Sequence, residues 1–225
     1  MDQRGLDRRT WLAGATAAGA LALVGEAGAA GAEEKKGQNI PPTEDLMREH
    51  GVLRRILIVY EEAGRRLLAG QDAAALGVVG SGAGIVRRFV EGYHEKLEEQ
   101  FVLPSLEKAG KLLELCKVIR TQHAAGRRLT EAILAAARSG DRRGAVRAMQ
   151  SFSGMYAAHA AWEDTDVFPA YRAQFTAAQL DELGDKFEGQ EHKLLGAGGF
   201  EGSLREVGDL EKTLGIHDLS RFTPA

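Results

Sequence analysis

Two pairs of side chains with the same spacing offer the most specific chemistry in this sequence. His94 and Glu98 lie four residues apart, and so do His159 and Glu163. Residues four apart on an α-helix stack on one face, about one turn from each other. Each pair can therefore grip one metal ion through an imidazole nitrogen and a carboxylate oxygen.

Both pairs belong to a longer internal repeat. Pro104 and Pro169 each follow a glutamate of these pairs by six residues, and His50 and His123 each precede an arginine doublet by four residues. The chain therefore reads as two related helical hairpins packed face to face. In an antiparallel bundle with a rise of about 1.5 Å per residue, these histidines and glutamates all lie at roughly one level.

Six such polar groups inside an apolar bundle would be costly unless they were paired or bound to metal. An isolated His-x-x-x-Glu pair is usually a solvated ion pair, but two copies with a histidine at matching depth on both remaining helices favour a metal site. The six expected ligands are His50, His94, Glu98, His123, His159 and Glu163.

The elements that must position these residues are long helices. Prolines occur only at 41, 42, 104, 169 and 224, and the segments between them are rich in Ala, Leu, Arg and Glu, which favour helix. We expect five helices: 43–68 with Thr43 as cap, a second that follows a Gly-containing loop at 77–84 and stops at Pro104, 111–138, Asp141 to about Pro169, and 176–195. The predicted fold class is all-α, an up-down-up-down four-helix bundle with the fifth, C-terminal helix across one end or side.

The composition is typical of a protein with one globular core, and the charge excludes some classes of binding partner. The 225 residues are 44% hydrophobic and 27% charged, and 29 Lys and Arg against 32 Asp and Glu give a net charge of −3. No basic field is available to hold nucleic acid or an anionic membrane. Because Cys116 is the one cysteine, any metal must bind through histidine and carboxylate.

The order of the expected ligands resembles a known family. With the trailing Val102-Leu103-Pro104 and Val167-Phe168-Pro169, it is similar to the hemerythrin-like, or HHE cation-binding, domain over residues 43–172. The resemblance implies a four-helix bundle that holds a non-haem di-iron centre. Its two iron ions would be bridged by carboxylates and by an oxo or hydroxo group.

Two positions depart from the oxygen-carrying hemerythrins. Those proteins have a second histidine one turn after the third-helix histidine, where this chain has Arg127. They also use an aspartate five residues after the fourth-helix histidine, where this chain has Asp164 beside Glu163. The internal repeat favours Glu163 as the ligand, and the missing histidine argues against reversible oxygen carriage.

Other residues could complete the site. The fifth helix carries Glu188, Glu191 and His192, and we expect His192 to act as an additional ligand or to cap the site; the alternative is a solvated acidic helix. Glu91 and Tyr156 each lie three residues ahead of a ligand histidine. Either could be a hydrogen-bond partner of a ligand.

The N-terminus predicts where the protein works. Arg8 and Arg9 precede a weakly apolar run from Leu12 to Val24 and small residues up to 32. This order is typical of a twin-arginine export signal over 1–32, the alternative being a disordered tail or an uncleaved anchor. We expect 33–42 to be a linker and 173–225 the fifth helix and tail, with no integral membrane span in the mature chain. The twin-arginine machinery would then deliver the folded protein to the periplasm or another extracytoplasmic compartment.

Two functions fit these observations. In the first, the di-iron centre interacts with oxygen, peroxide or nitric oxide, and the apolar walls exclude water. In the second, the protein is a non-catalytic module that stores, senses or donates iron. Imidazole and carboxylate ligands suit iron, zinc, manganese and copper alike. The sequence leaves open whether the protein is an enzyme and assigns no catalytic residue.

Overall fold

All secondary structure in the described residues is helical. The computed structural model describes residues 40–70 and 74–224, and these ranges contain no β-strand. The prediction of an all-α protein is therefore confirmed. None of the described helices is long and apolar enough to cross a membrane. The expected export signal, 1–32, lies outside the described residues.

The first helix, α1 (Pro42–Ala69), begins one residue earlier than the sequence suggests. Pro42 occupies the first turn, where its missing amide hydrogen costs nothing. Thr43 therefore lies inside the helix, buried, and does not cap it. Gly70 ends the helix in the left-handed conformation, with φ of 67°.

The glycine-rich segment is a helix, which corrects the prediction of a loop over 77–84. It forms most of α2 (Ala74–Ile85). A Cβ atom at Gly82 would lie 3.1 Å from Cε1 of Tyr60 on α1. The small residues therefore allow close packing of α2 on α1, and this tertiary contact outweighs the low helix propensity of glycine.

The second long helical segment continues through Pro104, so the expectation that this proline stops it is wrong. After α2 the segment consists of the π-helix η2 (Val86–His94), α3 (Glu95–Leu97), the π-helix η3 (Glu98–Val102) and α4 (Leu103–Lys108). In the wide turn of η3, the amide of Leu103 donates to the carbonyl of Glu98, five residues back. Pro104, which has no amide hydrogen to place, follows in the first turn of α4.

The next part of the chain, residues 113–172, also has a π turn before its proline. It consists of α5 (Leu113–Ser139), α6 (Arg142–Trp162), the π-helix η4 (Glu163–Val167) and α7 (Phe168–Arg172). As predicted, Asp141 caps α6 by accepting a 2.8 Å hydrogen bond from the amide of Gly144. The amide of Phe168 donates to the carbonyl of Glu163, and the helix then continues through Pro169.

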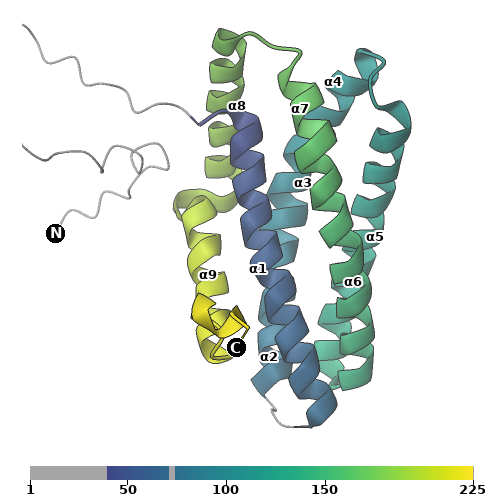
Figure 1. Ribbon diagram of the computed structural model, residues 1–225, viewed down its shortest axis with the longest axis vertical. Coiled ribbons are helices and arrows are strands. Elements are labelled where there is room, and N and C mark those ends of the chain that lie inside the picture. Colours follow the sequence, from purple (N-terminus) through teal and green to yellow (C-terminus); the bar gives the residue numbers. More distant parts are fainter. Residues whose placement is uncertain (1–39, 71–73, 225) are drawn as a thin grey trace, which may run out of the picture. The chain divides into compact units, whose positions relative to one another are not determined.

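Four long helical segments enclose the core. The helices α1 and α5 each pack against α2 and against α6, and Figure 1 shows these segments lying side by side. The rings of Tyr60 and Phe152 meet edge-on inside, with centroids 5.8 Å apart. Both side chains are buried, and burying each contributes on the order of 1.5–3 kcal/mol.

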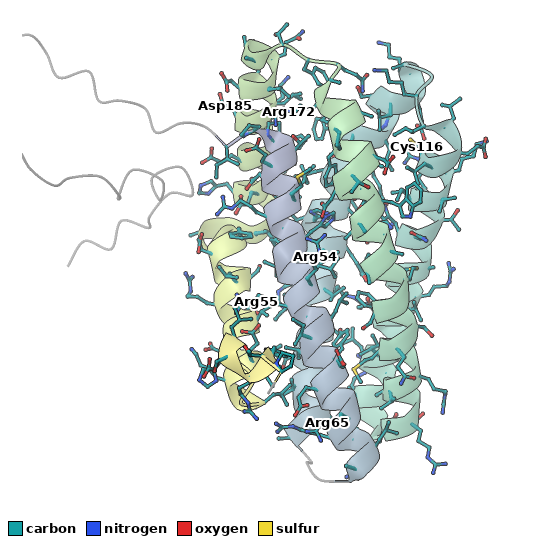
Figure 2. The ribbon with its side chains drawn as sticks, in the orientation of Figure 1. Arg54, Arg55, Arg65, Cys116, Arg172 and Asp185 are labelled. Atoms are coloured by element: carbon teal, nitrogen blue, oxygen red, sulfur yellow. The ribbon has the colours of Figure 1, made fainter. Side chains whose placement is uncertain are left out.

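The C-terminal part contains one helix more than the sequence predicted. Thr176 caps α8 (Ala177–Leu195) as expected, and the 3₁₀ turn η5 (Gly196–Gly198) then leads into α9 (Gly199–Thr213) instead of a tail. Figure 1 shows α8 and α9 along one side of α1. Arg55 of α1 donates from Nε to Oε1 of Glu211 on α9 at 2.7 Å, and Figure 2 shows Arg55 facing α9.

Candidate metal centre

The structure brings six of the seven expected ligands together at one level. Two groups of four side chains could each hold a metal ion, and both groups contain Glu98 and Glu163. The first adds His50 and His94, and the second adds His123 and His159. All six are buried, with at most 3% of each residue exposed. The two carboxylates therefore lie between two pairs of imidazoles.

In the first group, His50 and His94 direct Nε2 toward a common point. The two Nε2 atoms lie 3.1 Å apart. His94 Nε2 is 3.3 Å from Glu98 Oε1, and His50 Nε2 is 3.3 Å from Glu163 Oε2. Phe168 stacks on His50 with centroids 5.5 Å apart and forms an apolar wall.

The second group repeats this arrangement. His123 Nε2 is 3.2 Å from Glu98 Oε2, and His159 Nε2 is 3.0 Å from Glu163 Oε2. Glu98 thus presents one oxygen to each group, whereas one oxygen of Glu163 lies close to a histidine of each. Both glutamates are placed to bridge two ions.

These carboxylates have no hydrogen-bond donors to satisfy them. All four side-chain oxygens of Glu98 and Glu163, together with Nε2 of His123, are buried without a hydrogen bond in the described part of the chain. Two ligand atoms that share one ion at about 2.0–2.2 Å lie roughly 3.0–3.5 Å apart. The observed spacings match a shared ion, so the residues present fit a metal.

Two neighbouring carboxylates orient the histidines of the first group. His50 donates its Nδ1–H to Asp164 Oδ1 at 2.7 Å, and Asp164 also pairs with Arg54. Arg54 projects from the middle of α1 (Figure 2). His94 donates its Nδ1–H to Glu49 Oε2 at 2.8 Å. Both rings are therefore held as the tautomer whose Nε2 can bind metal.

The histidines of the second group have weaker acceptors. His159 donates its Nδ1–H to the amide oxygen of Gln122 at 2.8 Å. His123 is 3.3 Å from Glu99 Oε1 through Nδ1. The same rule of ring orientation applies, so all four Nε2 atoms face the centre.

Burial and neighbouring charges shift the pKa values of this cluster in opposite directions. Burial raises the pKa of Glu98, but the charges of the adjacent His94 and His123 outweigh it and hold the pKa well below its ordinary value. Burial lowers the pKa of His123, but Glu98 and Glu99 raise it to about 10. Without metal, positive charge beside the carboxylates is therefore supplied by protons on His94 and His123. A metal ion replaces those protons.

Arg127 supplies no ligand. Glu95, Glu99 and His123 form a third group of potential ligands beside the centre, and the Arg127 guanidinium lies against it. Its Nη2 is 2.6 Å from Glu95 Oε2 and 2.6 Å from Glu99 Oε1. The position that carries a second third-helix histidine in oxygen carriers is thus part of an ion pair.

Tyr156 joins the same network from α6. Its hydroxyl donates to Glu95 Oε1 at 2.6 Å, and its ring lies edge-on to that of His159, with centroids 5.2 Å apart. Gly126 of α5 makes room for it, because a Cβ atom there would lie 2.1 Å from the hydroxyl oxygen. The sequence allowed Tyr156 or Glu91 as a hydrogen-bond partner of a ligand; Tyr156 instead contacts the ligand His159 through its ring.

The structure does not place His192 with the other six. His192 is exposed on α8 and belongs to none of the metal-compatible groups among the described residues. Its neighbour Glu191 is buried and accepts a 2.6 Å hydrogen bond from the amide of Phe200, which satisfies the start of α9. The fifth helix therefore packs beside the centre without adding a ligand, which corrects the expectation for His192.

The ligand pattern in the sequence does not indicate the residues that orient the histidines. Each lies directly beside a ligand in the chain: Glu49, Glu99, Gln122 and Asp164. Of these four, the sequence suggests only Asp164, as an alternative ligand to Glu163. Adjacency was the available signal, but each of these residues bonds a histidine on a different helix, so the helix packing was needed to assign the pairs.

Comparisons with known proteins agree with this geometry. A family model described as the hemerythrin HHE cation binding domain matches residues 42–171. Uncharacterized proteins of Mycobacterium bovis and of two strains of Mycobacterium tuberculosis are each 44% identical to this chain over 226 residues, covering 94% of this chain and 88% of each relative. No solved structure matches the chain.

Proposed function

Because the chain belongs to the hemerythrin HHE cation-binding family, we propose that its His/Glu cluster binds two non-haem iron ions that interact with oxygen, peroxide or nitric oxide. One observation carries the proposal. Glu98 and Glu163 are fully buried, and their oxygens accept no hydrogen bond in the described part of the chain. Leaving buried carboxylates in this state is costly unless a cation lies between them.

Bound iron would supply redox chemistry toward a small ligand. The chain supplies the groups that would hold the iron: histidines with fixed tautomers and bridging carboxylates in a buried site. Four imidazoles and two carboxylates supply fewer ligand atoms than two six-coordinate ions need. Arg127 adds no ligand, because its guanidinium pairs with Glu95 and Glu99. Open positions favour reaction over reversible carriage, so we expect the reduced protein to be oxidised by oxygen rather than to form a lasting adduct.

An iron store or donor remains the alternative function. The fixed ring N–H bonds of the four histidines favour the reactive centre, because a site held in the ligating geometry has less need to rearrange as metal binds. Stoichiometric transfer of iron from the protein to a chelator without any reaction with peroxide or oxygen would favour the donor.

The four long segments enclosing the core would run up-down-up-down, in keeping with the short connections between them. Residues 1–32 would direct twin-arginine export to the periplasm, on the strength of the paired arginines and the weakly apolar run that follows.

Metal analysis of the full-length protein tests the iron centre. We expect two iron ions per chain and an absorption spectrum that changes with azide or peroxide. Glu98→Ala should lose metal and destabilise the bundle, because the buried imidazoles lose their partner ion. Glu107→Ala is the matched control. Glu107 lies on α4, and its ion pair with Arg120 is only partly buried. A folded Glu98→Ala protein that retains two iron ions would contradict the assignment.

Stopped-flow mixing of the anaerobically reduced protein with oxygen tests the reactivity. Irreversible oxidation of the iron is the expected result. An adduct that disappears under vacuum and forms again on re-exposure would restore the carrier function.

A further inference from the structure

The acceptors of the four histidine N–H groups follow the internal repeat of the chain. Glu49 and Gln122 directly precede His50 and His123, and each bonds the histidine on the other helix of its own hairpin. These two residues therefore occupy equivalent positions. One is a carboxylate and the other a neutral amide.

The second pair of equivalent acceptors differs in the same direction. Asp164 and Glu99 directly follow the two bridging glutamates, and each bonds a histidine of the opposite hairpin. The Nδ1-to-oxygen distance is 2.7 Å at Asp164 but 3.3 Å at Glu99. The Glu99 oxygen also accepts from Arg127 at 2.6 Å, and its other oxygen accepts from Lys96 at 2.7 Å. Glu99 therefore shares its charge with two cations, whereas Asp164 shares its charge with one, Arg54.

These differences change the ligands themselves. A carboxylate draws the ring proton more strongly than an amide does, and it raises the electron density at the opposite ring nitrogen. His94, which faces a carboxylate, is therefore a stronger metal ligand than His159, which faces Gln122. His50 is likewise a stronger metal ligand than His123, because its carboxylate acceptor is closer and shares its charge with fewer cations.

We propose that the two metal positions are unequal: the ion between His50 and His94 is held tightly, the ion between His123 and His159 is the labile one, and Gln122 sets the difference. This inference rests on the proposed function, because it requires two bound ions. It makes Gln122 a positioning residue that acts through His159. The second position is then the one at which metal exchanges.

Release of Co²⁺ from the loaded full-length chain to excess chelator, followed by absorption, tests the proposal. We expect two phases of equal amplitude, with rates that differ roughly 10- to 100-fold, the usual effect of such outer hydrogen-bond partners. Gln122→Glu, which restores the symmetry of the repeat, should slow only the faster phase. Glu49→Gln should accelerate only the slower phase. Both changes keep the size and shape of the side chain.

Gln150→Glu is the control, because Gln150 is exposed on α6 and the substitution adds the same charge. It should leave both phases unchanged, and circular dichroism should show equal helicity for all variants. Release in a single phase, or a Gln122→Glu protein with an unaltered faster phase, would overturn the inference alone. Uptake of fewer than two Co²⁺ ions per chain would overturn the proposed function as well.

Discussion

Replacing Gly126 by alanine sets helix propensity against packing. Gly126 lies inside α5, where alanine would normally stabilise a helix by about 1 kcal/mol. Here the new Cβ would lie 2.1 Å from the Tyr156 hydroxyl oxygen and 2.8 Å from two ring carbons. The ring must therefore move, and its hydrogen bond to Glu95 breaks.

The costs of the clash and of the lost hydrogen bond exceed the gain in helix propensity, so the substitution should destabilise the protein. Overpacking costs roughly 1–3 kcal/mol, and losing a hydrogen bond to a carboxylate costs roughly 1.5–3 kcal/mol. After the gain in helix propensity, the free energy of unfolding should fall by about 3 kcal/mol, which in a chain of this size lowers Tm by roughly 6–12 °C.

Urea denaturation of the metal-free protein, monitored by circular dichroism, measures this change. Gly154→Ala is the matched control, because a Cβ atom at Gly154 on α6 meets nothing within 4 Å. It should stabilise the protein by about 0.5–1 kcal/mol. A Gly126→Ala protein as stable as the wild type would refute the reasoning about Tyr156.

Four further predictions concern the metal centre, the fifth helix and the N-terminus. Because the folded-state pKa of His123 is about 10, its contribution to the stability of the metal-free protein is complete below pH 6.5 and is lost as pH rises toward 10, which denaturation midpoints across this range would show. Metal uptake should release protons, so metal affinity measured by competition should fall as pH falls. His192→Ala should leave iron content unchanged, since His192 is exposed away from the centre; loss of iron would return the fifth helix to the site. Arg8→Lys with Arg9→Lys should keep the protein in the cytoplasm, and normal processing outside would exclude a twin-arginine route.

Local sequence signals predicted the helices well wherever one chemical group decides the outcome. Asp141 and Thr176 cap helices as expected, because their side chains reach amides three residues ahead without help from other elements. Gly140 ends α5 through a different local effect, because glycine adopts the left-handed conformation, here with φ of 77°, without steric cost. Local signals failed where packing decides, as in α2, where Gly82 packs closely against Tyr60 of α1.

The prolines show the same limit. Pro104 and Pro169 predict the end of a helix, but a π turn before each one lets the helix continue. Local signals do not predict α9, because Gly196 and Gly198 precede it and Gly199 is its first residue. Its first turn is completed by the side chain of Glu191. Neither effect is visible in the local propensity of the residues.

The sequence by itself determined the six side chains that meet at the centre. Helical periodicity and the internal repeat are local and one-dimensional, so they place His94 with Glu98, and His159 with Glu163, before any packing is known. Tertiary structure alone decided which side chain holds each imidazole, and it excluded His192. The physical reason is that a hydrogen bond between helices depends on their rotation and height, which arise only when the apolar faces pack together.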